Sequence, residues 1–141
     1  MVPTLHIGQV MSERRDTVGL SEASKRKAER LDEEGRGSFR RACEAGVKIA
    51  LGTDAFIGDM HGTNAAELPL MMEQGGLSAM EAIVAGTKNA AECCLLGDQV
   101  GTLEAGKLAD MLLVDGDPLT DVTVLQDPGR FTVYKEGTLV P

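Results

Sequence analysis

One carboxylate in this sequence, Asp54, stands directly after a short apolar run. The run Val47–Leu51 (VKIAL) has a single polar member, and Gly-Thr-Asp follows it. A short apolar run between a predicted helix and a glycine is typical of a parallel strand buried on both faces. A carboxylate at the end of such a strand can orient a water molecule and take its proton. From the spacing alone a second interpretation stays open, in which Asp54 caps the loop or the next helix.

Two more polar side chains, His61 and Asn64, follow in the same predicted loop. Either could contact a bound small molecule. The local alternative is that Asn64 caps a helix while His61 is solvated. Glu67 is interpreted as a structural residue.

The elements that position these residues follow the order strand, helix, strand. Val2–Leu5 predicts a short strand, and residues 8–24, which are mixed and polar, predict a loop. Residues 24–46 predict a helix in two pieces, because Gly35 and Gly37 weaken its middle. The run Val47–Leu51 is then the second strand.

Further helices are predicted up to residue 97. In segment 61–76, Pro69 suits the first turn of a helix better than its middle. Ser78 and Glu81 have the spacing of a capping box. Thr87 can cap a short helix that follows it.

The character of the sequence changes near residue 98, from helical to β. Met111–Val114 predicts a strand, and residues 130–140 predict a terminal hairpin with Lys-Glu-Gly as its turn. Lys107 and Asp110 are interpreted as residues that fix turns. We therefore divide the chain into two units, residues 1–97 and 98–141.

Composition excludes several classes of partner. The 141 residues are 43% hydrophobic with a net charge of -8, so a basic face for nucleic acid or anionic membrane is not expected. The first residues lack the basic and long apolar regions of a signal peptide. The odd cysteine count, Cys43, Cys93 and Cys94, argues against a disulfide framework and favours a reducing cytoplasm. The adjacent pair is expected to be buried as small hydrophobes.

The order of four segments resembles the C-terminal part of metal-dependent amidohydrolases, in the branch of imidazolonepropionase-like and prolidase-like enzymes. The segments are GVKIALGTDAF, HGTNAAEL, GLSAMEAIVAGTKNAAECCLLGD and VGTLEAGKLADMLLVDGDPLTDV. The resemblance implies an α/β fold: the C-terminal portion of a (β/α)8 TIM barrel in residues 1–97, and the C-terminal strands of a small composite β-sandwich in residues 98–141. In that frame Val47–Thr53 is the last barrel strand, and barrel active sites lie at the carboxyl ends of the strands.

The same resemblance implies a chemistry for the site. Asp54 would be a metal ligand and a catalytic proton shuttle, and His61 and Asn64 would contact the substrate. The cofactor would be a divalent metal, zinc by expectation, which lowers the pKa of bound water to about 7. The substrate would be a small amide, cyclic amide or dipeptide.

The sequence lacks most of the ligands that the family uses. The family has a His-x-His pair and further histidines, whereas this chain has only His6 and His61. We therefore expect the isolated chain to be inactive, and to need a complementing N-terminal chain or self-association. The alternative is a non-catalytic structural or binding module.

Overall fold

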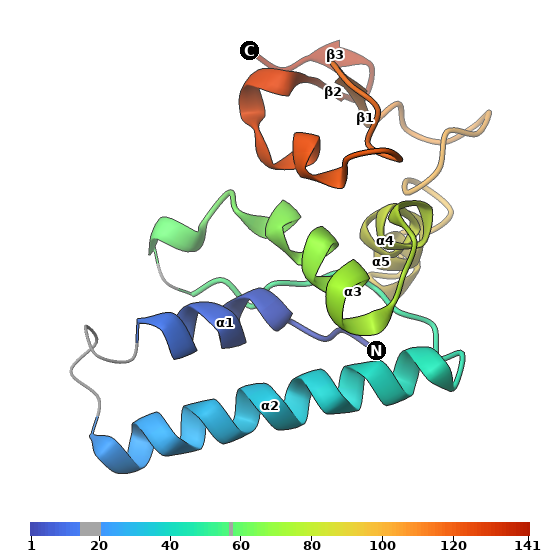
Figure 1. Cartoon of the computed structure of the whole chain (residues 1–141). Coiled ribbons are helices and arrows are strands. Elements are labelled where there is room, and N and C mark those ends of the chain that lie inside the picture. The colour runs from blue at the N-terminus through green and yellow to red at the C-terminus, as the bar shows by residue number, and fades with distance from the viewer. Residues whose placement is uncertain (15–20, 57) are drawn as a thin grey trace.

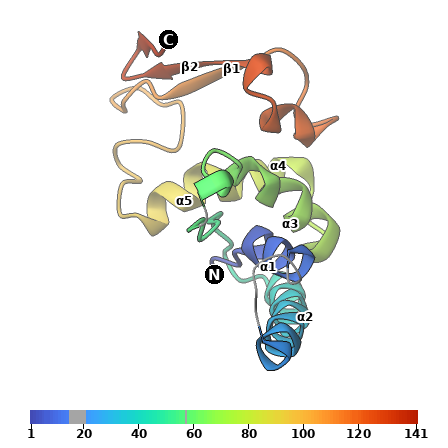
Figure 2. The ribbon, with the colours of Figure 1, turned by 90° about the vertical axis from the view of Figure 1, so that its left-hand side faces the viewer.

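The structure, a computed structural model, describes residues 1–14, 21–56 and 58–141. Its elements lie in three tiers: α1 and α2 on one side, α3 to α5 in the middle, and the strands with η3 and η4 on the other side (Figures 1 and 2). In chain order they are α1 (Leu5–Glu13), α2 (Glu22–Glu44), η1 (Gly58–Met60), η2 (Asn64–Ala66), α3 (Glu67–Gly75), α4 (Ala79–Gly86), α5 (Lys88–Cys93), β1 (Met111–Val114), η3 (Val122–Gln126), η4 (Pro128–Arg130), β2 (Phe131–Lys135) and β3 (Thr138–Leu139).

The N-terminal expectations are partly wrong. Leu5 begins α1 instead of ending a strand, and helix occupies residues 8–13 of the predicted loop. Leu5 and Val10 are buried, so the helix is held by tertiary packing. Residues 15–20 of that loop lie outside the described residues.

The long helix α2 is continuous, so the prediction of two pieces is wrong. Gly35 and Gly37 remain helical because α2 packs along α1 and α3, and packing of its apolar face outweighs the cost of two glycines. Ser21 caps the start, and its side chain accepts a hydrogen bond from the Ser24 amide. Gly46 follows the helix with a φ of 69°, the left-handed conformation expected where a glycine ends a helix.

The core lies between the first two tiers. Phe39 of α2 and Met71 of α3 are fully buried there, and Ile49 is a buried member of the same cluster. Val122 of η3 joins the same cluster and is 5% exposed, so the C-terminal segment is attached to the helices by its own apolar contact.

The middle helices largely match the expectations. Pro69 falls in the first turn of α3, and the capping box of Ser78 and Glu81 is present at the start of α4. Thr87 does not cap α5 with its side chain, and its hydroxyl donates to the carbonyl of Ile83 in α4 at 2.7 Å.

The strands form one antiparallel sheet in the order β1-β2-β3. Met111 lies opposite Tyr134, and Lys135 lies opposite Thr138 across a two-residue turn. Both turn residues, Glu136 and Gly137, have positive φ, which confirms the predicted hairpin. The described chain is thus a set of helices with a small three-stranded sheet, and none of its described helices combines the length and apolarity that crossing a membrane requires.

We predict opposite effects for two glycine-to-alanine changes in the helices. A Cβ at Gly75 would lie 2.5 Å from Phe39 Cε1, and Phe39 is fully buried, so Gly75→Ala should destabilise the chain by about 1–3 kcal/mol. A Cβ at Gly35 meets nothing within 4 Å, so Gly35→Ala should stabilise α2 by about 0.5–1 kcal/mol. Urea denaturation of both variants measures the two changes in the free energy of unfolding. Equal changes in the two variants would contradict the described packing.

Candidate active site

Residues 47–54, called the Asp54 segment below, run through the core without forming a ladder strand, which corrects the predicted parallel strand. Met1 is hydrogen-bonded to one edge of this segment. The Met1 amine donates to the carbonyl of Lys48 at 2.7 Å, and the Ala50 amide donates to the carbonyl of Met1 at 2.9 Å. These two bonds bracket Ile49 as in a parallel pair. The pairing does not extend further, so neither partner is a strand.

The other edge of the segment faces α4 and α5. The Leu51 amide donates to the carbonyl of Ala85 at 2.9 Å, and the Asn89 side chain donates to the carbonyl of Ile49 at 2.7 Å. An ion pair of 2.6 Å between Lys48 and Glu92 adds a third link, and the hydrogen bond from Lys48 lowers the pKa of Glu92. The segment is therefore held on both edges as it approaches Asp54.

Asp54 itself lies at the exposed end of this segment. Its φ is 50°, an uncommon conformation for a residue other than glycine. Its side chain is exposed and makes no hydrogen bond or ion pair with another described residue. Within the described chain, Asp54 does not act as a cap, which was the local alternative.

His61 and Asn64 lie in the loop that contains η1 and η2, and both are exposed. Across residues 1–14, 21–56 and 58–141, no polar side-chain contact joins either of them to Asp54. Asn64 is the first residue of η2 and does not cap it; the capping position belongs to Thr63, which makes no side-chain capping bond. The expectation that both side chains contact the substrate stays a prediction.

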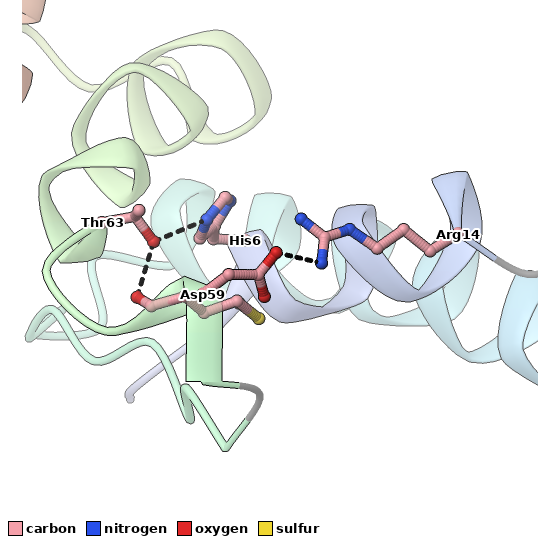
Figure 3. A network of polar contacts seen from close by, with 5 residues as sticks. His6, Arg14, Asp59 and Thr63 are labelled. Atoms are coloured by element: carbon pink, nitrogen blue, oxygen red, sulfur yellow. Dashed lines mark hydrogen bonds and ion pairs between the residues drawn. The ribbon is translucent and has the colours of Figure 1, made fainter. Parts of the chain in front are cut away.

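The same loop is tied to α1 by a polar network that the sequence did not predict (Figure 3). Arg14 pairs with Asp59, and His6 Nε2 lies 3.1 Å from Thr63 Oγ1. The Thr63 hydroxyl donates its hydrogen to the carbonyl of Met60 at 2.7 Å. The Thr63 oxygen can therefore only accept from His6, so His6 Nε2 is the donor. Sequence separations of 45 and 57 residues explain why no local pattern revealed these contacts.

Glu67 completes the attachment of α1 and confirms the structural interpretation of this residue. It is fully buried, and its carboxylate accepts from the amides of Leu5 at 3.0 Å and His6 at 2.8 Å. A carboxylate at a helix N-terminus satisfies orphan amides and complements the helix dipole. Burial raises the pKa of Glu67, against the opposing effect of the two hydrogen bonds.

In the C-terminal segment, Lys107 and Asp110 fix turns as expected. Lys107 donates to the Thr102 hydroxyl at 2.6 Å, and Asp110 pairs with Lys135 and accepts from the Glu136 amide. The bond from Lys135 lowers the pKa of Asp110. Cys93 and Cys94 are exposed at the end of α5, so the expectation that they are buried is wrong.

Comparison with known proteins places this geometry in a family. The model of the amidohydrolase family matches residues 5–140, nearly the whole chain. The chain belongs to the amidohydrolase family. The matched range includes most of residues 1–97 and most of residues 98–141.

Three relatives illustrate the match of this amidohydrolase chain. It is 38% identical to ochratoxinase from Aspergillus niger over 125 residues, which cover 86% of this chain and 25% of that protein. It is 38% identical to imidazolonepropionase from Geobacillus sp. over 80 residues, 54% of this chain and 18% of that one. A solved Xaa-Pro dipeptidase with methionine bound in its active site superposes with a TM-score of 0.86 at 37% identity, over 99% of this chain and 34% of that one.

This amidohydrolase chain therefore spans about a quarter of the ochratoxinase and about a third of the Xaa-Pro dipeptidase. Amidohydrolases typically depend on a bound metal, and a protein metal site needs at least three ligands. Among the described residues no group of three or more His, Cys, Asp or Glu side chains could hold a metal ion. Asp54 alone does not fit the family's metal centre, and no catalytic step through a metal is assigned to this chain by itself.

Proposed function

We propose that this chain is the C-terminal part of a metal-dependent hydrolase of C–N bonds in amides, cyclic amides or dipeptides, and that it is inactive in isolation. The observation that carries the proposal is the superposition on the Xaa-Pro dipeptidase over 99% of this chain but only 34% of that enzyme. In the complete enzyme, residues 1–97 would belong to the (β/α)8 barrel and residues 98–141 to the composite β-sandwich.

Asp54 is the residue to which we give the catalytic role. It would serve as metal ligand, with zinc as the expected metal, and as the carboxylate that takes a proton from the attacking water, once a complementing N-terminal chain supplies the other ligands. Its exposure at the end of a segment held on both edges supports this role. His61 and Asn64 are proposed as substrate contacts, since both are exposed in the loop that follows. A reducing cytoplasm is the proposed location, and three unpaired cysteines support it.

The proposal is tested in a chimera that carries residues 1–141 in place of the matched third of the Xaa-Pro dipeptidase. Because the rest of that enzyme retains its own ligands, the chimera is expected to hydrolyse the dipeptide Met-Pro, whereas the isolated chain is not. The assay measures released proline. A folded, metal-loaded chimera without activity would contradict the proposal.

A non-catalytic module that self-associates is the second candidate, and one observation favours it. Leu112 and Leu113 lie on opposite faces of β1 and are 51% and 58% exposed. Both faces of the sheet are thus open to solvent at β1 within the described chain, whereas an antiparallel sheet commonly packs one face on a core, and a second chain could cover one of them. Sedimentation of the isolated chain tests this candidate: a monomer that unfolds cooperatively would contradict it.

A further inference from the structure

The TKNAAE motif, residues 87–92, has no role in the function proposed above, yet one of its side chains reaches the Asp54 segment. Asn89 lies in the first turn of α5 and is partly buried. Its side-chain amide donates to the carbonyl of Ile49 at 2.7 Å, across 40 residues of sequence. Ile49 is only 6% exposed, so water has little access to compete for that carbonyl.

The direction of the backbone groups explains why this contact matters. In an extended segment, successive backbone groups point to alternate edges. The carbonyl of Lys48 and the amide of Ala50 point toward Met1, whereas the carbonyl of Ile49 and the amide of Leu51 point the other way. No described strand lies along that second edge. The Asn89 side chain pairs with the carbonyl of Ile49, and the Ala85 carbonyl pairs with the amide of Leu51. Without these partners the two buried backbone groups would lose their hydrogen bonds, and the segment would be free to move.

We propose that Asn89 is a positioning residue, which holds the backbone of the Asp54 segment from the side of α5 and so sets where Asp54 is presented. This inference rests on the function proposed for Asp54. Leu51, the last residue held from that side, is three positions before Asp54. Gly86 allows the close approach of α4, since a Cβ there would lie 3.3 Å from Leu51 Cδ1. Asn89 does not touch the reacting atoms and acts only through the segment.

Hydrogen exchange on the whole 141-residue chain tests the link by NMR. Asn89→Ala is expected to speed exchange of the Leu51 amide about 3- to 10-fold, the effect of losing one hydrogen bond, and to shift the carbonyl carbon of Ile49. The amide of Asp115, which donates to the Arg130 carbonyl at 2.7 Å in the distant sheet, should keep its rate. Lys88→Ala, one residue away on the same exposed turn, is the matched control and should change neither.

Two outcomes would overturn the proposal. One is a Leu51 rate within two-fold of the wild type, and the other is an equal acceleration at Leu51 and Asp115, which would indicate general destabilisation. In the dipeptidase chimera, Asn89→Ala should lower kcat for Met-Pro about 3- to 10-fold per folded protein with KM unchanged, and unchanged kcat would also overturn it. If Asp54→Asn leaves turnover of the chimera intact, the proposed function of Asp54 fails. The exchange rate of the Leu51 amide still tests Asn89 in that case, so the two failures are distinguishable.

Discussion

Asp54→Asn in the dipeptidase chimera is expected to lower kcat for Met-Pro by about 10²–10⁴-fold, the range of a positioned general base. The asparagine keeps the size of the side chain but cannot take a proton from water. In the isolated chain Asp54 is exposed and makes no polar contact with another described residue, so there the change should leave the free energy of unfolding within about 0.5 kcal/mol. Steady-state kinetics of the chimera and thermal unfolding of the isolated chain check the two expectations.

A second exposed aspartate supplies the control for this prediction. Asp98 lies near the boundary between the two units, and Asp98→Asn removes the same charge far along the chain from the Asp54 segment. Turnover of this variant should match the parent chimera. If Asp54→Asn also retains turnover, the catalytic role of Asp54 is wrong.

The largest effect on stability is expected for Glu67→Ala, at about 2–4 kcal/mol. The change removes the acceptor of the Leu5 and His6 amides and leaves the buried Leu5 amide without a partner, which costs about 1–3 kcal/mol for that group alone. The packing between α1 and α3 is also lost around the truncated side chain. Glu73→Ala on the exposed face of the same helix is the control and should change stability by less than about 0.5 kcal/mol. Equal effects of the two variants in urea denaturation would contradict the anchoring role.

The pH dependence of the same carboxyl has a defined sign. Burial raises the pKa of Glu67 in the folded chain, so the folded state holds its proton more tightly than the unfolded state. The contribution of this pKa shift to the free energy of unfolding is then fully present below the unfolded pKa of Glu67, about 4.3, and is lost as pH rises through the folded pKa. The free energy of unfolding of the wild type relative to Glu67→Gln should therefore fall as pH rises above the unfolded pKa and through the folded pKa. A rise over that window would contradict the stated cause of the shift.

The sequence predicted well those elements whose signals are local. The capping box of Ser78 and Glu81 and the Lys-Glu-Gly turn are each encoded within four residues, and both form as expected. The strand Met111–Val114 also forms as expected, although its partner β2 follows only after η3 and η4. Family membership followed from the order of four segments and is confirmed.

The elements that the sequence missed depend on contacts between distant residues. The helix α1 is held by Glu67, which is 62 residues away from Leu5, and its start has no local cap to predict it. The apolar run Val47–Leu51 has the composition of a strand, but a strand needs a neighbour, and its only described extended neighbour is Met1. Asp54 as a site residue stays a prediction from its place after that run. The role proposed for Asn89 required the structure, because nothing local distinguishes it from a capping asparagine.

The central claim is that this chain is one part of a metal-dependent amidohydrolase and does not complete the metal centre alone. Metal content per chain, measured by mass spectrometry on the purified and desalted 141-residue protein, tests it most directly. The account predicts well below one ion per chain, because a single exposed carboxylate does not retain a divalent ion that prefers four ligands. About one or two zinc ions per chain, retained through desalting, would contradict it.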